Sequence, residues 1–193
     1  MNNQGPHLAA LARFGLPPEQ AAEIGDYLDL LAVWSRRVNL TGAHSPEERV
    51  RILVEPVLPA VAAIDSGPLV DIGSGNGSPG LVLAAVRPDL GVVLLEPRQK
   101  RWVFLVEAAR GLRREKVVSV VRARYQDYMG PPAGALVSRG LRVRLREIAR
   151  LVRPGGQVLA FGGSVAPEPP FCLERTIPVS GSSISVFRRA RFT

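Results

Sequence analysis

The chain has 193 residues, and 46% of them are apolar, so it can bury the core of one ordinary domain and is not a disordered chain. The single cysteine, Cys172, excludes a disulfide framework and is expected in the core. No secretory signal and no apolar run of the ~20 residues that cross a bilayer is present, which favours a cytoplasmic protein without a membrane segment. The net charge is +8, and all but two of the 25 basic residues are arginine. This favours a polyanionic partner, although a genome that prefers arginine codons would give the same composition.

The N-terminal part is predicted to be helical. Residues 17–37 carry an apolar stripe at helical spacing. A second helix is predicted after Ser45, which can cap it while Glu48 completes a capping box. Residues 1–65 are therefore predicted to form a helical region packed on the core, and residues 66–193 the main domain.

After residue 66, short apolar runs alternate with amphipathic segments. Strands are predicted at 68–72, 91–96, 116–121, 135–138 and 155–161, and helices at 78–86, 98–112 and 141–152. Because these strands are apolar on both faces, they predict a parallel sheet covered on both sides, an α/β doubly wound fold. Residues 172–179 and 182–189 flank a Ser-Gly turn and predict an antiparallel pair at the sheet edge.

The turn after the first predicted strand is rich in glycine. The segment VDIGSGNGSPGLVLA (70–84) lies at the strand end where parallel sheets bind ligands, and its glycines let the backbone approach closely. Glu96 ends the second strand, where a carboxylate can accept hydrogen bonds from two ribose hydroxyls. Together these features predict a site for an adenosine-containing ligand, the alternative being a purely structural turn.

The acid before this turn favours a cationic ligand. GNGSPG (75–80) matches the pattern that binds a pyrophosphate, but Asp71 would repel that anion. S-adenosylmethionine carries a sulfonium and an ammonium group, and DIGSG (71–75) has the acid-x-Gly-x-Gly form used by class I methyltransferases. We therefore predict a class I S-adenosylmethionine-dependent methyltransferase, with a Rossmann-like sheet and an N-terminal helical cap. The alternative is a dehydrogenase.

Several classes of methyl acceptor are excluded by motifs that the sequence lacks. SRGL (138–141) stands where amine methyltransferases carry an Asn/Asp-Pro-Pro-aromatic motif, and Cys172 is misplaced for a pyrimidine C5 nucleophile. His7, His44 and one cysteine cannot supply a zinc cluster, so no metal is predicted. Acceptors with a free lone pair remain, and guanine N7 is one that needs no general base.

Four segments together resemble one family. WSRRVNLT (34–41), VDIGSGNGSPGLVLAAVRPD (70–89), LLEPRQKR (94–101) and SR (138–139) occur in the order found in the bacterial ribosomal RNA small subunit methyltransferase G family, also called glucose-inhibited division protein B. The resemblance covers roughly residues 20–163. It implies transfer of a methyl group from S-adenosylmethionine to guanine N7 in small-subunit (16S) ribosomal RNA, naked or in a ribosomal particle. We also expect a monomer.

The resemblance implies roles for individual residues. Arg139 and Asn39 are expected to be catalytic, with Thr41 in the turn that follows Asn39. The residues expected at the cofactor, including those of the glycine turn, are Asp71, Gly73, Gly75, Ser78, Glu96, Tyr125, Gln126 and Arg139.

Several positions depart from the family pattern. Ile52, Glu55 and Pro56 stand where the family has a histidine and an Asp-Ser pair, and Gly162 where it has a lysine. A proline-rich loop replaces the helix after the fifth strand, so the C-terminal part is expected to be shortened. Two alternatives stay open: a non-catalytic relative that binds the methyl donor, and a methyltransferase acting on a protein or small molecule.

One further surface is predicted on the helix at 141–152. Arg142, Arg146 and Arg150 recur at every fourth position, and Arg153 follows. This spacing predicts a polyanion-binding face, the alternative being a solvated one.

Overall fold

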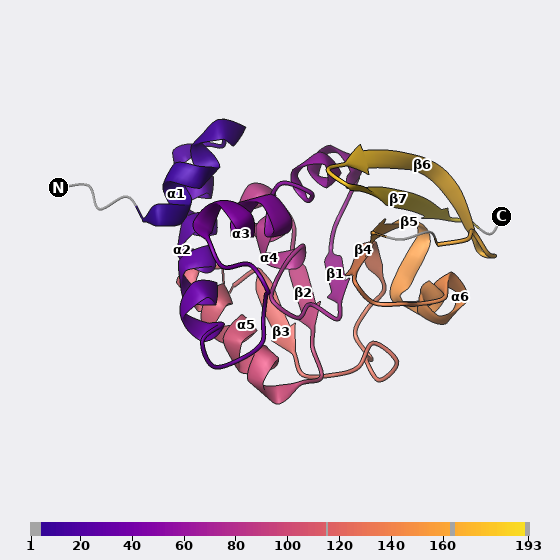
Figure 1. Ribbon diagram of the computed structural model, residues 1–193. Helices are drawn as coiled ribbons and strands as arrows, with labels where there is room; N and C mark the ends of the chain where they lie inside the picture. The colour runs from indigo at the N-terminus through magenta and orange to yellow at the C-terminus, as the bar shows by residue number, and fades with distance from the viewer. Residues whose placement is uncertain (1–4, 115, 163–164, 192–193) are drawn as a thin grey trace.

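A mixed sheet forms the centre of the molecule (Figure 1). The structure is a computed structural model that describes residues 5–114, 116–162 and 165–191, and within them seven strands form one sheet. The strands are β1 (Leu69–Ile72), β2 (Val92–Leu95), β3 (Val118–Val121), β4 (Ala133–Arg139), β5 (Val152–Phe161), β6 (Phe171–Val179) and β7 (Ser182–Arg189), in the spatial order β3-β2-β1-β4-β5-β7-β6. Strands β1 to β5 are parallel, and β7 is antiparallel to β5 and β6. This order confirms the predicted class I methyltransferase fold.

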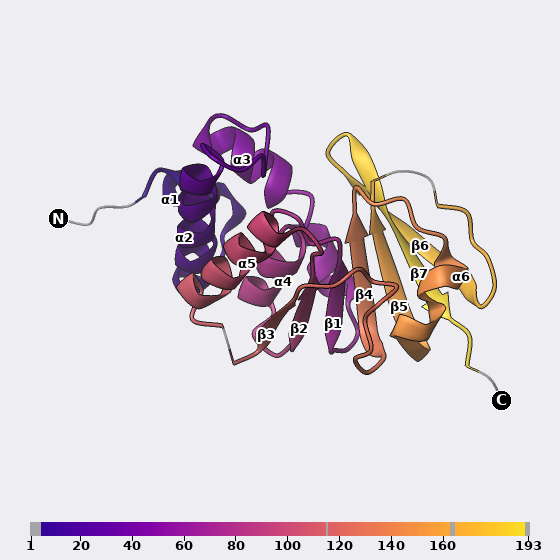
Figure 2. The same ribbon diagram turned by 90° about the horizontal axis from the view of Figure 1, so that it is seen from below.

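Most helices lie on one face of the sheet. The helices are α1 (Pro6–Leu11), α2 (Pro18–Trp34), α3 (Pro46–Leu53), α4 (Gly80–Val86), α5 (Gln99–Gly111) and α6 (Leu145–Ile148), with 3-10 turns η1 (Ala12–Phe14), η2 (Leu58–Ala63) and η3 (Ala149–Leu151). Figure 2 shows α1, α2, α4 and α5 gathered on one side, with α6 on the other. The predicted cap of α3 is confirmed, since Ser45 Oγ accepts from the backbone N–H of Glu48 at 3.1 Å. None of the described helices is long and apolar enough to span a membrane.

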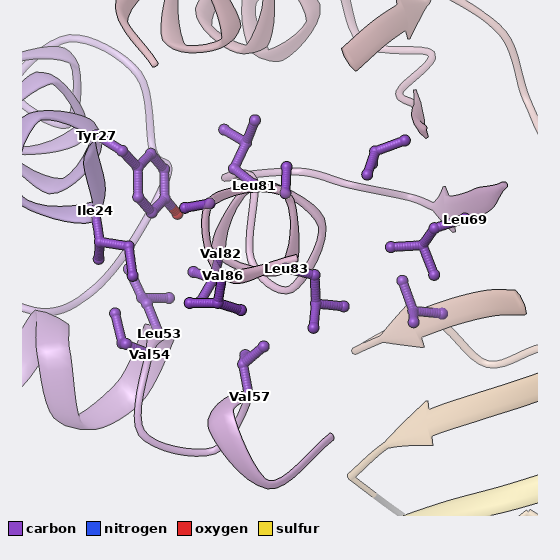
Figure 3. Close-up of a cluster of buried hydrophobic side chains, with 14 of the residues drawn as sticks. Ile24, Tyr27, Leu53, Val54, Val57, Leu69, Leu81, Val82, Leu83 and Val86 are labelled. Carbon is purple, nitrogen blue, oxygen red and sulfur yellow. The ribbon is translucent and has the colours of Figure 1, made fainter. Parts of the chain in front are cut away.

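The N-terminal helices share their core with the sheet. All seven residues of α4 are buried, because α2 and the segment after α3 cover its outer side while the sheet covers its inner side. Figure 3 shows Ile24 and Tyr27 of α2 facing α4, with Val57 approaching it from the segment after α3. The division into residues 1–65 and 66–193 stays a prediction, since one hydrophobic cluster runs across both.

The Arg-Pro-Asp segment after α4 is a structural clamp. Arg87 Nη1 donates to the carbonyl oxygens of Val61 (3.1 Å) and Ile64 (2.9 Å), and Asp89 accepts from the same guanidinium at 2.7 and 2.8 Å. The clamp satisfies two carbonyls at the end of η2 and so holds the N-terminal region against the sheet.

The helix predicted at 141–152 is wrong in extent. Only α6 and η3 are helical there, because Val152 joins the sheet opposite Ala133 and is fully buried. The predicted polyanion-binding face stays a prediction, and two of its arginines make internal hydrogen bonds. Arg150 donates to the carbonyl oxygens of residues 125, 126 and 128, and Arg153 donates to Ser66 Oγ at 2.7 Å.

The C-terminal pair is confirmed as the hairpin β6–β7. Strand β6 is the outermost strand, so most of its side chains face solvent. Cys172 is therefore exposed, and the expectation that it is a core residue is wrong. Between β5 and β6, the described residues (162 and 165–170) form no helix, as the proline-rich composition predicted.

Candidate active site

A cavity of about 420 Å³ opens at the carboxyl ends of β1, β2 and β4. We call it the donor cavity. The residues that line it are Leu40, Thr41, Ile52, Leu53, Gly73, Ser74, Gly75, Asn76, Ser78, Glu96, Pro97, Arg98, Arg101, Arg139, Gly140 and Leu141. It therefore brings together the glycine turn, the end of the second strand and the end of the fourth, as the sequence predicted.

The glycine turn contributes backbone without side chains to the wall of the donor cavity. Gly73 and Gly75 have φ values of 70° and 53°, a region that glycine occupies without steric cost. A Cβ on Gly73 would lie 3.2 Å from Leu141, and one on Gly75 would lie 3.6 Å from Arg101, both of which line the cavity. The bare backbone is thus part of the cavity wall.

Glu96 lines the donor cavity and is only 3% exposed. Its Oε2 accepts from the N–H of Gly75 at 3.0 Å, and its Oε1 accepts from the N–H of Arg98 at 2.8 Å. Each carboxylate oxygen can accept a further bond, so the fixed carboxylate can also receive two ligand hydroxyls. The geometry suits the predicted ribose contact.

Asp71 lies behind the turn and does not line the donor cavity. Its Oδ2 accepts from the N–H of Gly80, at the start of α4, at 3.0 Å. A Cβ on Gly80 would come within 2.6 Å of that oxygen, so no larger residue fits there. The side chain supports the turn from inside, and its predicted contact with the cofactor stays a prediction.

We expect Asp71 to make stability depend on pH. Burial raises its pKa from 3.8 to about 7. Between these values the folded chain holds a proton that the unfolded chain has released, so stability falls as pH rises through this window. Asp71→Asn cannot ionise, and its stability relative to the unmutated protein should therefore increase from about pH 4 to about pH 7 and then level off.

Urea unfolding across this pH range would measure the difference. Asp26→Asn is the matched control, because Asp26 is an exposed aspartate on α2 that lies outside the donor cavity. A flat profile for Asp71→Asn would show that the buried carboxyl ionises as it does in water.

Arg139 joins three elements at the edge of the cavity. Its Nη1 donates to Ser78 Oγ at 2.9 Å, and its Nη2 donates to the carbonyl oxygen of Ile52 at 2.6 Å. Ser78 Oγ in turn donates to the carbonyl oxygen of Leu53 at 2.7 Å. Burial lowers the pKa of Arg139, but a guanidinium remains charged in proteins. The end of β4 thereby fixes both the glycine turn and the end of α3.

Asn76 is a site residue that the sequence reasoning missed. Its Nδ2 donates to the carbonyl oxygen of Leu40 at 3.1 Å, and its Oδ1 accepts from the N–H of Ser78 at 3.1 Å. The hydroxyl of Tyr27 donates to its carbonyl oxygen at 2.8 Å. The available signal was an amide side chain between two turn glycines, a residue type that bonds neighbouring backbone.

Besides Asp71, three of the predicted site residues lie outside the donor cavity. Asn39 is exposed, and its carbonyl oxygen accepts from Arg101 at 3.0 Å, while Thr41 does line the cavity. Tyr125 donates to Glu147 at 3.0 Å, and Gln126 is exposed. The catalytic role of Asn39 and the adenine contact of the 125–126 pair remain predictions.

The lining suits S-adenosylmethionine. The volume lies in the range of about 300–1,000 Å³ typical of small-molecule sites. The Glu96 carboxylate matches vicinal ribose hydroxyls, and the guanidinium groups of Arg98 and Arg101 offer partners for the carboxylate of an amino acid. The predicted cofactor contact of Arg139 stays a prediction. Among the described residues, no cluster of His, Cys, Asp and Glu is arranged to hold a metal ion.

Comparison with known sequences identifies the family. The family model described as "GidB: rRNA small subunit methyltransferase G" matches residues 20–186. The chain belongs to this family. It is 38% identical over 172 residues to the ribosomal RNA small subunit methyltransferase G of Salinispora arenicola, covering 78% of this chain and 71% of that protein. It is 36% identical over 171 residues to the same protein of Alkalilimnicola ehrlichii, covering 86% of this chain and 77% of the relative.

Solved structures support the fold of this family member. An RNA methyltransferase from Salinibacter ruber in complex with S-adenosyl-L-homocysteine is similar, with a TM-score of 0.60 at 17% identity over 71% of this chain and 92% of that one. The putative methyltransferase yhhF from Escherichia coli has a TM-score of 0.60 at 14% identity, covering 79% of this chain and 91% of its own. At these identities the likeness shows the fold alone.

Proposed function

We propose that this protein transfers a methyl group from S-adenosylmethionine to guanine N7 in small-subunit ribosomal RNA. The observation that carries the proposal is the Glu96 carboxylate, fixed by the glycine turn inside the donor cavity of a chain that belongs to the methyltransferase G family. Ribosomes are assembled in the cytoplasm, so we propose a cytoplasmic location, and a monomeric state that light scattering would test.

The protein acts in this proposal by positioning. S-adenosylmethionine, when bound, supplies an electrophilic methyl group. Glu96 holds the ribose, the bare backbone of the turn allows close approach, and Arg139 fixes the turn against α3. Guanine N7 carries a lone pair and no proton, so no general base is required. This agrees with the donor cavity, whose described titratable side chains are Glu96 and the three arginines.

Methyl transfer to undermethylated small ribosomal subunits tests the proposal. The protein is incubated with labelled methyl donor, and the ribosomal RNA is then digested to nucleosides. Labelled N7-methylguanosine is the expected product. Label in protein alone would favour a methyltransferase with another substrate, and no transfer despite tight binding of S-adenosylhomocysteine would favour a non-catalytic relative.

A basic groove offers a docking surface for the RNA. Val33, Trp34, Arg36, Arg37, Val38 and Lys100 line a cavity of about 470 Å³ between the end of α2 and the start of α5. Arg36, Arg37 and Lys100 are exposed, and none of the lining residues that the structure describes is a carboxylate. Cations beside an aromatic ring suit a single RNA strand, whose phosphates and bases they bind. The segment after Val38 leads directly into the donor cavity through Leu40 and Thr41.

Replacing Arg36, Arg37 and Lys100 together by alanine should make RNA binding less dependent on salt. The slope of log affinity against log salt concentration should shrink by about 2, at about 0.7 per phosphate contact in a single strand. The matched control replaces Arg142, Arg144 and Arg146, three exposed arginines beside α6. A smaller slope in the control than in the groove variant would place the RNA on the α6 side instead.

A further inference from the structure

A second cavity adjoins the donor cavity. It has a volume of about 390 Å³, and we call it the hairpin cavity because the tip of β6–β7 forms one wall. Its lining residues are Arg51, Ile52, Pro56, Arg139, Gly140, Phe161, Gly162, Val179, Ser180, Ser182 and Ser183. Figure 2 shows α3 and the hairpin tip at the same end of the molecule as the carboxyl ends of β4 and β5.

The two cavities meet at three shared residues, one of which is a glycine. Ile52, Arg139 and Gly140 line both of them. The guanidinium of Arg139 is held against Ser78 and the carbonyl of Ile52. Gly140 has a φ of 67°, and no heavy atom lies within 4 Å of the position its Cβ would take. A group in the hairpin cavity can therefore approach the donor cavity past bare backbone.

The hairpin cavity has the chemistry of a nucleotide site. Partly buried Ile52, Pro56 and Val179 supply apolar walls, and three serines supply hydroxyls that both donate and accept hydrogen bonds. Among the described residues that line it, the charged ones are two arginines and none is a carboxylate. The Arg51 side chain is 59% exposed, and its ion pair with Glu48 is long at 3.9 Å. Arg51 can therefore bind a phosphate with little loss of other contacts.

We propose that the hairpin cavity holds the acceptor nucleotide, with N7 of the guanine toward Gly140, its Watson–Crick edge on the hairpin serines and its phosphate on Arg51. The inference rests on the proposed function and names the residues that select its substrate. Serine hydroxyls can donate to guanine O6 and accept from N1–H and the N2 amino group. N7 then stays free to receive the methyl group.

Filling the cavity from its exposed rim tests this proposal. Ser182 is exposed at the hairpin tip, so Ser182→Phe should occupy the cavity without disturbing the core. Thr176→Phe is the matched control, because Thr176 is exposed on the same hairpin but does not line the cavity. Binding of guanosine monophosphate is measured by saturation-transfer NMR on protein saturated with S-adenosylhomocysteine, with adenosine monophosphate as the comparison ligand.

Ser182→Phe should weaken guanosine monophosphate binding and lower kcat/KM for subunit methylation at least tenfold, with S-adenosylhomocysteine affinity unchanged. Arg51→Ala should raise KM for the subunit about tenfold and leave kcat nearly unchanged. The control should match the unmutated protein in every assay.

Three results would overturn the proposal. These are no binding of guanosine monophosphate to the unmutated protein, equal binding of adenosine monophosphate, or normal methylation by Ser182→Phe. Normal N7-methylguanosine formation by Ser182→Phe would leave the proposed function standing without this site. Binding that depends on Ser182, in a protein that methylates no ribosomal particle, would keep the site and remove the function.

Discussion

Replacing Arg139 by alanine is expected to lower the rate of methyl transfer about 100-fold, the scale of a lost orientation. The alanine variant leaves Ser78 Oγ and the carbonyl of Ile52 without their donor. These two groups belong to the glycine turn and to α3, the elements that meet between the donor and hairpin cavities. The glycine turn and α3 should then lose their mutual alignment, even though each element keeps its own fold.

The split between kinetic parameters separates positioning from general damage. We expect kcat to fall while the affinity for S-adenosylhomocysteine changes only a few fold, since Glu96 is untouched. Arg139→Lys should recover little, because a single ammonium cannot reproduce two divergent hydrogen bonds from one planar group. Arg175→Ala is the control, since Arg175 is exposed on β6 and lies outside both cavities. Methylation at the unmutated rate by Arg139→Ala would show that this bridge has no part in the reaction.

Replacing Glu96 by alanine is expected to weaken S-adenosylhomocysteine binding at least tenfold. Hydrogen bonds to a charged group are worth about 1.5–3 kcal/mol, and one tenfold step is about 1.4 kcal/mol. The variant also frees the N–H groups of Gly75 and Arg98, which the carboxylate now holds at 3.0 and 2.8 Å. Both effects act on the donor cavity, and isothermal titration calorimetry would measure their sum.

Glu96→Gln separates the loss of the ligand's hydrogen bonds from the loss of the bonds that hold Gly75 and Arg98. The amide keeps the shape and one acceptor oxygen but loses the charge, so its affinity should lie between those of the unmutated protein and Glu96→Ala. Glu107→Ala is the matched control, because Glu107 is exposed on α5 and lies outside the donor cavity. An unchanged affinity in Glu96→Ala would mean that the ribose binds elsewhere.

Local pattern was sufficient for much of the fold. Local sequence predicted the capped start of α3, the helical stripe of α2 and the alternation of strands and helices after residue 66. Each of these features depends on neighbours in the sequence. Position in the strand–turn–helix units also placed Glu96 beside the glycine turn. Both lie at strand ends, and parallel strands end at the same edge of a sheet.

Predictions from local spacing were wrong where a residue makes its main contacts with a distant segment of the chain. The apolar spacing over 141–152 favours a helix, but strand β4 offers Val152 a buried place in the sheet, and a local pattern cannot weigh that contact. Spacing alone placed Arg150 on an open helical face, whereas its guanidinium donates to three carbonyl oxygens of the preceding loop.

The amino-acid sequence by itself therefore determined the types of most elements, the family and the position of the glycine turn, since these follow from residue spacing along the chain. Only the tertiary structure decided which polar groups meet. It turned Asp71 away from the cavity, bridged Arg139 to Ser78 and Ile52, and set the hairpin serines beside them. The physical reason is that hydrogen bonds act over about 3 Å, and segments more than 60 residues apart reach that distance only when the sheet is assembled.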